Sequence, residues 1–259
     1  MFEGRDEMRL GADLAARAYL YSLFHMVFSG VCSAELVSKL FGEQTLNLFH
    51  QACGWLPSKS SLAKGVVGLD FGLGKSERTL QECIDEFVAC ADANKETALN
   101  ESEDSTALSE LCEVLKSDYA KLFQVPGEMY VYPWESPYVN VEGTLFQAST
   151  LDVRSYYHQA GFKLQAEQHF PDDHIAAMLD YLGRMGQRAY DAFADGEDTV
   201  CSELLAKQQE FMQKHVLTWV DVFVDRVIER DMRAYYSAFA GAVAVLVYAD
   251  KALLADLMA

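Results

Sequence analysis

Apolar residues recur at helical spacing along almost the whole chain, and this periodicity constrains the fold more than any other feature. The spacing is three to four residues from about residue 10 onward. It returns around residues 34–41, 43–53, 77–93, 106–123, 151–159, 172–194, 200–227 and 232–257. Alternating patterns are nearly absent. The sequence therefore predicts an all-α protein, a compact multi-helix bundle in which helices pack on helices.

The segments between these helices are polar or irregular. Residues 57–75 hold four glycines and a proline, and the acidic residues 94–105 have the composition of a mobile loop. Residues 124–148 form a long segment rich in proline and glycine. Within it, residues 129–132 are the one short strand candidate.

The chain of 259 residues carries a formal net charge of −18. The electrostatic field of so negative a protein repels nucleic acid and anionic lipid and attracts basic ligands. A requirement for solubility alone also explains the negative charge. The longest uncharged apolar stretch, residues 234–249, is too short to cross a membrane and predicts a buried core helix. We therefore expect no nucleic-acid partner and no stable membrane insertion.

The cysteines predict a reducing compartment. They form no CxxC pair and no tight cluster, which is typical of buried thiols in a cytoplasmic protein rather than of disulfides or a zinc site. Their positions are Cys32, Cys53, Cys83, Cys90, Cys112 and Cys201.

Two proline-bearing loops are the candidates for function, because binding residues concentrate on loops held by a rigid scaffold. The aromatic loop, residues 129–138, includes Tyr132-Pro133-Trp134-Glu135-Ser136-Pro137-Tyr138. The Asp-His loop, residues 170–174, reads Phe170-Pro171-Asp172-Asp173-His174. Prolines keep the aromatic loop out of a helix interior, so its rings either plug the core or line a groove. A groove of this kind, beside acidic residues, suits an extended peptide with apolar and basic side chains.

Three segments that resemble catalytic or metal sites also have structural explanations. In Gly68–Ser76 the first glycine stands one residue too early for a phosphate loop, and an inter-helix loop explains the segment. Asp173 and His174 resemble an orienting carboxylate and a general base, but no nucleophile accompanies them. The spacing of His169 and His174 does not suit a helix-face metal pair. In the structural alternative, Asp172 or Asp173 caps the following helix and His174 packs beside it.

Several motifs over about residues 115–225 together resemble the TorD/DmsD family of cytoplasmic chaperones. These chaperones serve molybdenum-cofactor oxidoreductases that are exported through the twin-arginine pathway. The motifs are Tyr119-Ala-Lys-Leu-Phe123, Pro126-Gly127-Glu128, Tyr132-Pro133-Trp134-Glu135-Ser136, Leu145-Phe146, Tyr156-Tyr157, Gly161, Phe170-Pro171-Asp172-Asp173-His174-Ile175, Gln209-Glu-Phe211, His215 and Trp219.

The resemblance implies a chaperone and not an enzyme. Its partners would be a molybdopterin-containing oxidoreductase subunit and the signal peptide of that subunit, held until cofactor insertion and export. It implies no resident cofactor and leaves weak guanine-nucleotide binding open. The implied peptide-binding positions are Tyr132, Pro133, Trp134, Glu135, Ser136, Tyr138, Pro171, Asp172, Asp173 and His174.

The resemblance also implies two helical lobes joined by a hinge loop. The N-terminal lobe covers residues 1–165, including the loop at 124–148. The hinge covers 166–174, and the C-terminal lobe covers 175–259; residues 1–259 can equally count as one domain. Related chaperones exchange lobes, so the chain is expected to be a monomer or a domain-swapped homodimer.

One residue departs from the family pattern. Phe170 stands where the family has a glutamate, so a guanidinium would need another carboxylate, such as Glu135, Glu167 or Asp172.

Two other functions stay open. One is a nucleotide-binding switch or an enzyme that uses the Gly68–Ser76 loop with Asp173 and His174. The other is a general helical adaptor.

Overall fold

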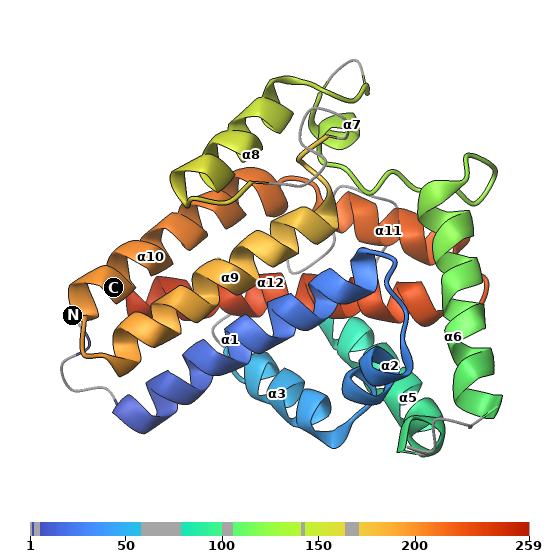
Figure 1. Cartoon of the computed structure of the whole chain (residues 1–259), viewed down its shortest axis with the longest axis horizontal. Coiled ribbons are helices and arrows are strands. Elements are labelled where there is room, and N and C mark those ends of the chain that lie inside the picture. Colours follow the sequence, from blue (N-terminus) through green and yellow to red (C-terminus); the bar gives the residue numbers. More distant parts are fainter. Residues whose placement is uncertain are drawn as a thin grey trace.

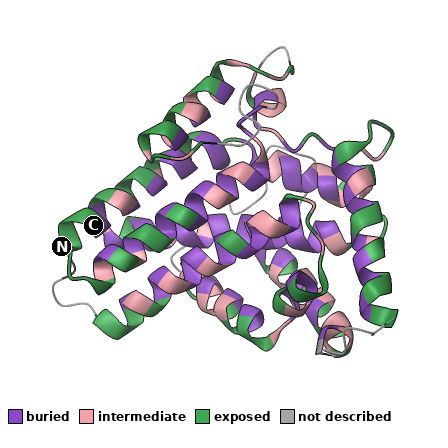
Figure 2. Cartoon of the chain, in the orientation of Figure 1, coloured by how far each residue is buried: buried purple, intermediate pink, exposed green. Residues whose placement is uncertain are grey.

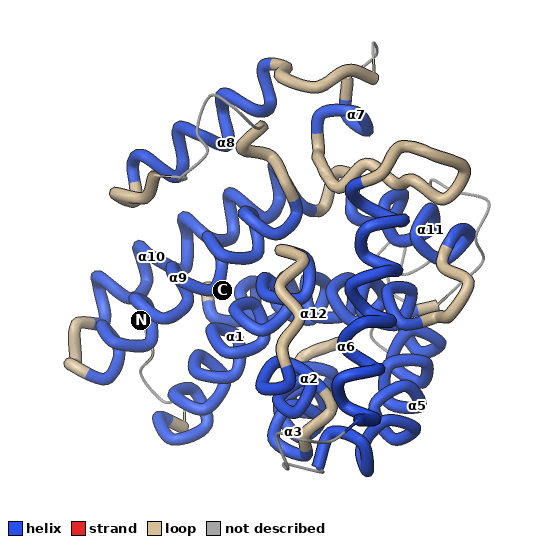
Figure 3. Tube along the Cα trace, turned by 45° about the vertical axis from the view of Figure 1, so that its right-hand side comes forward, coloured by secondary structure: helices blue, strands red, loops and turns tan. Residues whose placement is uncertain are grey.

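The structure, a computed structural model, describes residues 2, 6–57, 79–99, 106–140, 143–163 and 171–258. All regular elements in this part of the chain are helices, which confirms the predicted all-α class (Figures 1 and 3). Two of them, η1 and η2, are short π-helical turns. The elements are α1 (Glu7–Phe28), α2 (Ala34–Leu40), α3 (Glu43–Cys53), α5 (Leu80–Leu99), α6 (Thr106–Tyr119), η1 (Ala120–Gln124), α7 (Ser136–Val139), α8 (Ala148–Gln159), α9 (Ile175–Ala194), α10 (Asp198–Phe211), η2 (Met212–Val216), α11 (Val220–Arg230) and α12 (Tyr235–Leu257).

Helix α12 forms the centre of the core (Figure 2). Every residue from Tyr236 to Val247 is buried, and α1, α3, α5 and α11 pack around the helix. By length and hydropathy α12 could cross a membrane, but 78% of its apolar window is buried inside the protein. The prediction of a buried core helix is therefore confirmed.

Helices α1 and α9 pack along much of their length, and two glycines of α9 allow their close approach. A Cβ at Gly183 would lie 2.7 Å from the Oγ atom of Ser22, and a Cβ at Gly186 would lie 3.3 Å from the Cα atom of Ala18. The helix that follows the predicted hinge thus rests directly on the first helix of the chain. The division into lobes stays a prediction, because residues 164–170 lie outside the described part.

A buried polar network joins α1 to α10 and α12. The guanidinium of Arg17 pairs with the carboxylate of Asp250, and both side chains are fully buried. Tyr21 donates to the same carboxylate at 2.9 Å, and Arg17 donates to the Oε1 atom of Gln208 at 3.1 Å. Since a buried charge is costly without its partner, this network fixes the three helices relative to one another.

Three sequence predictions about elements were wrong. Residues 94–99 continue α5 instead of forming a loop, because Ala98 extends the buried face of that helix. The single helix expected over 200–227 is interrupted by η2 and a turn, where the indole of Trp219 donates to the carbonyl of His215 at 2.6 Å. Residues 129–132 form no strand.

Candidate functional site

The structure brings the aromatic loop and the Asp-His loop together at the start of α9 (Figure 3). The N–H group of Glu135 donates to the carbonyl of Asp173 at 3.0 Å, and the N–H group of Ile175 donates to the carbonyl of Pro133 at 2.8 Å. These two bonds flank an isolated antiparallel bridge. Segments about 40 residues apart in sequence are thereby locked as one unit.

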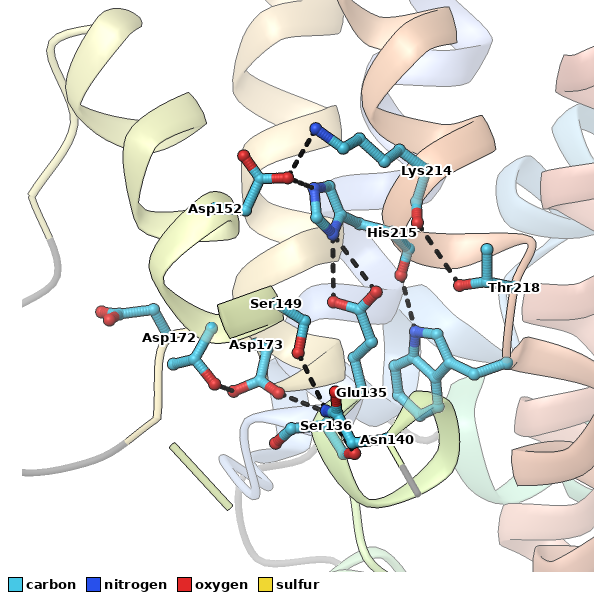
Figure 4. A network of polar contacts seen from close by, with 12 residues as sticks. Glu135, Ser136, Asn140, Ser149, Asp152, Asp172, Asp173, Lys214, His215 and Thr218 are labelled. Atoms are coloured by element: carbon cyan, nitrogen blue, oxygen red, sulfur yellow. Dashed lines mark hydrogen bonds and ion pairs between the residues drawn. The ribbon is translucent and has the colours of Figure 1, made fainter. Parts of the chain in front are cut away.

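The carboxylate of Asp173 strengthens this junction. It accepts the N–H group of Ser136 at 2.7 Å and the hydroxyl group of Thr150 at 3.1 Å, and Asp173 is fully buried. Asp173 therefore connects the Asp-His loop both to α7 and to the first turn of α8 (Figure 4). The expectation that Asp172 or Asp173 caps α9 is wrong, because this carboxylate is directed across the junction.

His174 is the residue that caps α9. Its Nδ1 atom accepts the N–H group of Ala176 at 3.1 Å, so the imidazole is neutral and carries its proton on Nε2. Burial, together with the nearby His25, lowers the pKa of His174 to about 4. The ring also packs edge-on against Trp134 at 5.2 Å between centroids. His174 is thus a structural residue of the junction as well as a half-buried part of its surface.

Asp172 is held by α8. Its carboxylate is 1% exposed and pairs with the guanidinium of Arg154, at 2.6 Å from Nε and 2.5 Å from Nη2. The hydroxyl group of Tyr157 donates to the backbone carbonyl of Asp172 at 3.1 Å. The Asp-His loop is therefore fastened to α8 as well as to the aromatic loop.

Glu135 begins a chain of polar side chains that ends at the surface (Figure 4). Its buried carboxylate lies 3.1 and 3.2 Å from the Nδ1 atom of His215, which is on η2. The Nε2 atom of the same ring lies 3.2 Å from Asp152, which also binds Lys214 at 2.5 Å. Burial raises the pKa of Glu135, whereas the hydrogen bond from Lys214 lowers the pKa of Asp152. This chain anchors the aromatic loop to α8 and η2.

The ten predicted site residues divide into a surface group and a buried group. Tyr132 is exposed, with 41% of its surface accessible, and Trp134, Tyr138 and His174 are half-buried. The other six are buried and hold the junction together: Pro133, Glu135, Ser136, Pro171, Asp172 and Asp173. The aromatic loop therefore both plugs the core and presents rings at the surface.

The exposed rings are well supported. Tyr132 packs edge-on against Tyr130 at 5.0 Å, and its carbonyl accepts the hydroxyl group of Tyr138 at 2.7 Å. The ring of Tyr138 stacks against Trp219 at 5.2 Å and lies 4.6 Å from the guanidinium carbon of Arg226. Such fixed rings lose little conformational entropy when a ligand binds.

Of the three carboxylates proposed to replace the family glutamate, two are engaged inside the protein. Glu135 binds His215, and Asp172 binds Arg154. Glu167 and Phe170 lie outside the described residues, as do His169 and the Gly68–Ser76 loop.

Sequence reasoning missed four residues that hold the site: Thr150, Asp152, Arg154 and Lys214. They occupy ordinary helical positions, and their partners lie 18 to 63 residues away. For His215 and Trp219 the family resemblance was the only signal.

The described part of the chain is all-helical, and a locked loop junction carries aromatic rings at its surface. Residues 89–225 match the family model described as nitrate reductase delta subunit. A chaperone protein TorD from Shewanella oneidensis is 31% identical over 169 residues, which are 62% of this chain and 69% of that protein. One from Shewanella sp. strain ANA-3 is 27% identical and covers 94% of this chain and 96% of its own length.

The chain belongs to the TorD family of redox-enzyme maturation chaperones. This confirms the family predicted from the motifs. It also confirms that the protein is not an enzyme, because the relatives are named as chaperones.

Proposed function

We propose that this protein is a cytoplasmic chaperone for a molybdopterin-containing oxidoreductase. It binds the twin-arginine signal peptide, the apo form of that enzyme, or both, and holds them until the cofactor is inserted and export begins. Family membership supports the maturation role. The observation that carries the peptide-binding part is the exposed ring of Tyr132, fixed at the surface by the junction of the two loops.

The proposed binding surface consists of Tyr132 with the half-buried Tyr130, Trp134, Tyr138 and His174. Aromatic faces bind apolar side chains and attract cations, so the surface suits a segment that carries both. The net charge of −18 adds long-range attraction for a basic peptide. Because Glu135 and Asp172 are engaged internally, we propose that ring faces and exposed carboxylates such as Glu128 receive the arginines.

The test is binding of a fluorescent twin-arginine peptide and of its Lys-Lys variant, at low and moderate salt. We expect tighter binding of the arginine form, since a guanidinium stacks on aromatic rings better than an ammonium does. Tyr132→Ala should weaken binding roughly tenfold, as expected for an interfacial aromatic anchor. Val200→Ala, an exposed apolar position on α10, is the matched control. Equal affinity for both peptides would indicate a general helical adaptor, and no binding of either would refute the proposal.

The purified protein also serves to test the expectations about cofactors, nucleic acid, membranes and oligomeric state. We propose that the protein has no resident cofactor, does not bind nucleic acid and does not insert stably into membranes. Saturable binding of GTP or ATP that disappears in Lys75→Ala would instead support the nucleotide-binding alternative. Light scattering coupled to size-exclusion chromatography distinguishes a monomer from a domain-swapped homodimer.

A further inference from the structure

A small pocket lies where the end of α6 meets the turn between α11 and α12 (Figure 1). Its volume is about 210 Å³. Pockets that enclose a whole small ligand usually measure roughly 300–1,000 Å³. This pocket is therefore better suited to one side chain of a larger partner than to a free small molecule.

Apolar side chains from three segments line the pocket. Leu122 of η1 is buried, Met129 of the aromatic loop is half-buried, and Met232, in the turn before α12, is 86% exposed. Methionine side chains are flexible and polarisable, so they adapt to apolar partners of different shapes. The pocket thus offers an adaptable apolar contact at the surface.

The backbone of the turn that carries Met232 is held in place. The carboxylate of Asp231 accepts the N–H group of Arg233 at 3.2 Å. It also accepts the N–H group of Ser237 at 2.8 Å and the hydroxyl group of the same residue at 3.0 Å. Because these bonds fix the turn before a partner arrives, binding at Met232 would order little additional backbone.

Asp118 contributes an unsatisfied polar atom to the lining. The residue is 7% exposed, and its Oδ1 atom pairs with the guanidinium of Arg233. Its Oδ2 atom is buried and has no hydrogen-bond partner. A buried acceptor without a donor costs free energy, and a donor supplied by a ligand would recover that cost. The pocket therefore combines apolar contact with an acceptor for one further hydrogen bond.

The charge of the lining favours a neutral donor. Among the described lining residues, Asp118 and Asp231 are acidic and Lys121 and Arg233 are basic, so the formal charges cancel. A cation gains no net attraction from such a lining. The backbone N–H group of a peptide is a neutral donor that always accompanies its side chain. A peptide segment with an apolar residue thus fits the pocket on both counts.

The pocket continues into the surface proposed above for the client. Met129 stands three residues before Tyr132, and three residues of extended chain span at most about 11 Å. Between them, the carbonyl of Tyr130 accepts a hydrogen bond from Arg230, and the ring of Tyr130 packs against Tyr132 at 5.0 Å. One extended peptide of a few residues can therefore reach the pocket and the rings together.

We propose that this pocket binds one apolar side chain of the client polypeptide, of about the size of leucine. The Oδ2 atom of Asp118 accepts a backbone N–H group beside that side chain. The inference rests on the proposed function in taking the ligand to be a client polypeptide. It adds a position for an apolar residue next to the rings that receive the arginines.

The experiment follows the methyl signals of the nine methionines in the NMR spectrum of the full chain, labelled with ¹³C at these methyl groups. The probe is the peptide acetyl-Ala-Leu-Leu-Ala-amide, and acetyl-Ala-Ser-Ser-Ala-amide is its polar counterpart. Met129→Leu and Met232→Leu assign the two signals of the pocket. We expect the leucine peptide to shift both signals and the serine peptide to leave them in place.

Met232→Ser tests the apolar contact. It should weaken binding of the leucine peptide roughly tenfold, as expected for an apolar residue at the centre of a contact. Met8→Ser is the matched control, because Met8, on α1, is also 86% exposed and does not line the pocket. It should bind as the unmodified chain does. Since both positions are exposed, neither change disturbs the core.

Asp118→Asn tests the hydrogen bond. Arg233 keeps the amide oxygen at the position of Oδ1, so the NH₂ group takes the place of Oδ2 and cannot accept a bond. Binding of the leucine peptide should fall roughly tenfold, the usual value for a hydrogen bond to a charged group. If Asp118→Asn does not fold, Met232→Ser and its control decide alone.

The inference is overturned if the leucine peptide moves neither signal, if the serine peptide serves as well, or if either pocket variant binds with unchanged affinity. A dimer that Met232→Ser converts to a monomer, with both signals unmoved by peptide, would show that a second copy of the chain occupies the pocket. That result would overturn the inference as well.

The outcome is distinct from that of the proposed function. Binding of the leucine peptide that is lost in Met232→Ser and kept in Tyr132→Ala would support the pocket even if the twin-arginine peptide does not bind. Twin-arginine binding that is weakened by Tyr132→Ala, with the pocket signals unmoved by the leucine peptide, would support the loop surface and refute the pocket.

Discussion

Acidification should destabilise the protein through His174, the imidazole that caps α9. The cap requires a neutral ring, because Nδ1 accepts the N–H group of Ala176. A protonated ring would lose this bond and would place a positive charge at a helix N-terminus. His25, which contacts the carbonyl of Ala176, adds to the cost.

The magnitude follows from the two pKa values. Burial and His25 lower the pKa of His174 from 6.5 to about 4, so the unfolded chain takes up a proton more readily than the folded chain between these values. The stabilisation is present above about pH 6.5 and is lost as the pH falls toward 4. Between about pH 8 and about pH 5 the loss amounts to about 2 kcal/mol, since one pKa unit corresponds to about 1.4 kcal/mol.

The assay is urea unfolding followed by far-UV circular dichroism at several pH values, for the unmodified chain and for His174→Asn. Asparagine is a good helix cap that does not titrate. Because other groups titrate in both proteins, the informative quantity is the difference between their free energies of unfolding. That difference should change by about 2 kcal/mol between about pH 8 and about pH 5, in favour of the variant at low pH. His50→Asn, at an exposed position of α3, is the matched control. A difference that stays constant with pH would refute the reasoning.

Three further predictions concern the contacts that hold the fold and the site. His215→Ala leaves the buried Glu135 without its partner and should lower the free energy of unfolding in urea by roughly 3 kcal/mol. Lys214→Ala, at the exposed end of the same chain of side chains, should lower the free energy of unfolding by less than about 1 kcal/mol. Equal losses in the two variants would contradict the role of His215 as the partner of buried Glu135. Arg17→Met should lower the free energy of unfolding by roughly 3–5 kcal/mol, because it leaves the buried carboxylate of Asp250 without a cation. The added change Asp250→Leu should restore most of this stability in the same assay. Gly186→Leu should cost roughly 1–3 kcal/mol by separating α1 from α9. Gly127→Ala should cost far less, because the added Cβ would lie 4.0 Å from its nearest neighbour, the carbonyl oxygen of Val125; similar melting temperatures of the two variants would argue against tight packing between α1 and α9.

Local features of the sequence predicted most of the helices. In α1, α3, α8 and α9 the apolar spacing gives nearly the observed bounds, because each helix buries one continuous face. The end of α5 was missed because, among residues 94–98 of this polar stretch, Ala98 alone is buried, and the polar composition outweighed it. The interruption after α10 depends on how Trp219 packs, which periodicity does not encode.

The candidate site shows more clearly what the sequence alone could not predict. The sequence singled out both loops by their prolines and aromatic rings. It could not show that they pair, because Glu135 and Asp173 stand 38 residues apart and meet only through the tertiary fold. The cap was assigned to an aspartate on propensity, whereas Asp173 is drawn away by Ser136 and Thr150, which leaves His174 to accept the bond. Tertiary hydrogen bonds here outweigh local preference.

The ion pair between Arg17 and Asp250 joins residues 233 positions apart. During synthesis on a ribosome, at about 5–20 residues per second, Arg17 would wait roughly 10–50 s for its partner to be made. Until then α1 lacks α12, the helix that buries and pairs with the guanidinium of Arg17. The protein consequently completes its own folding only when its last helix leaves the ribosome.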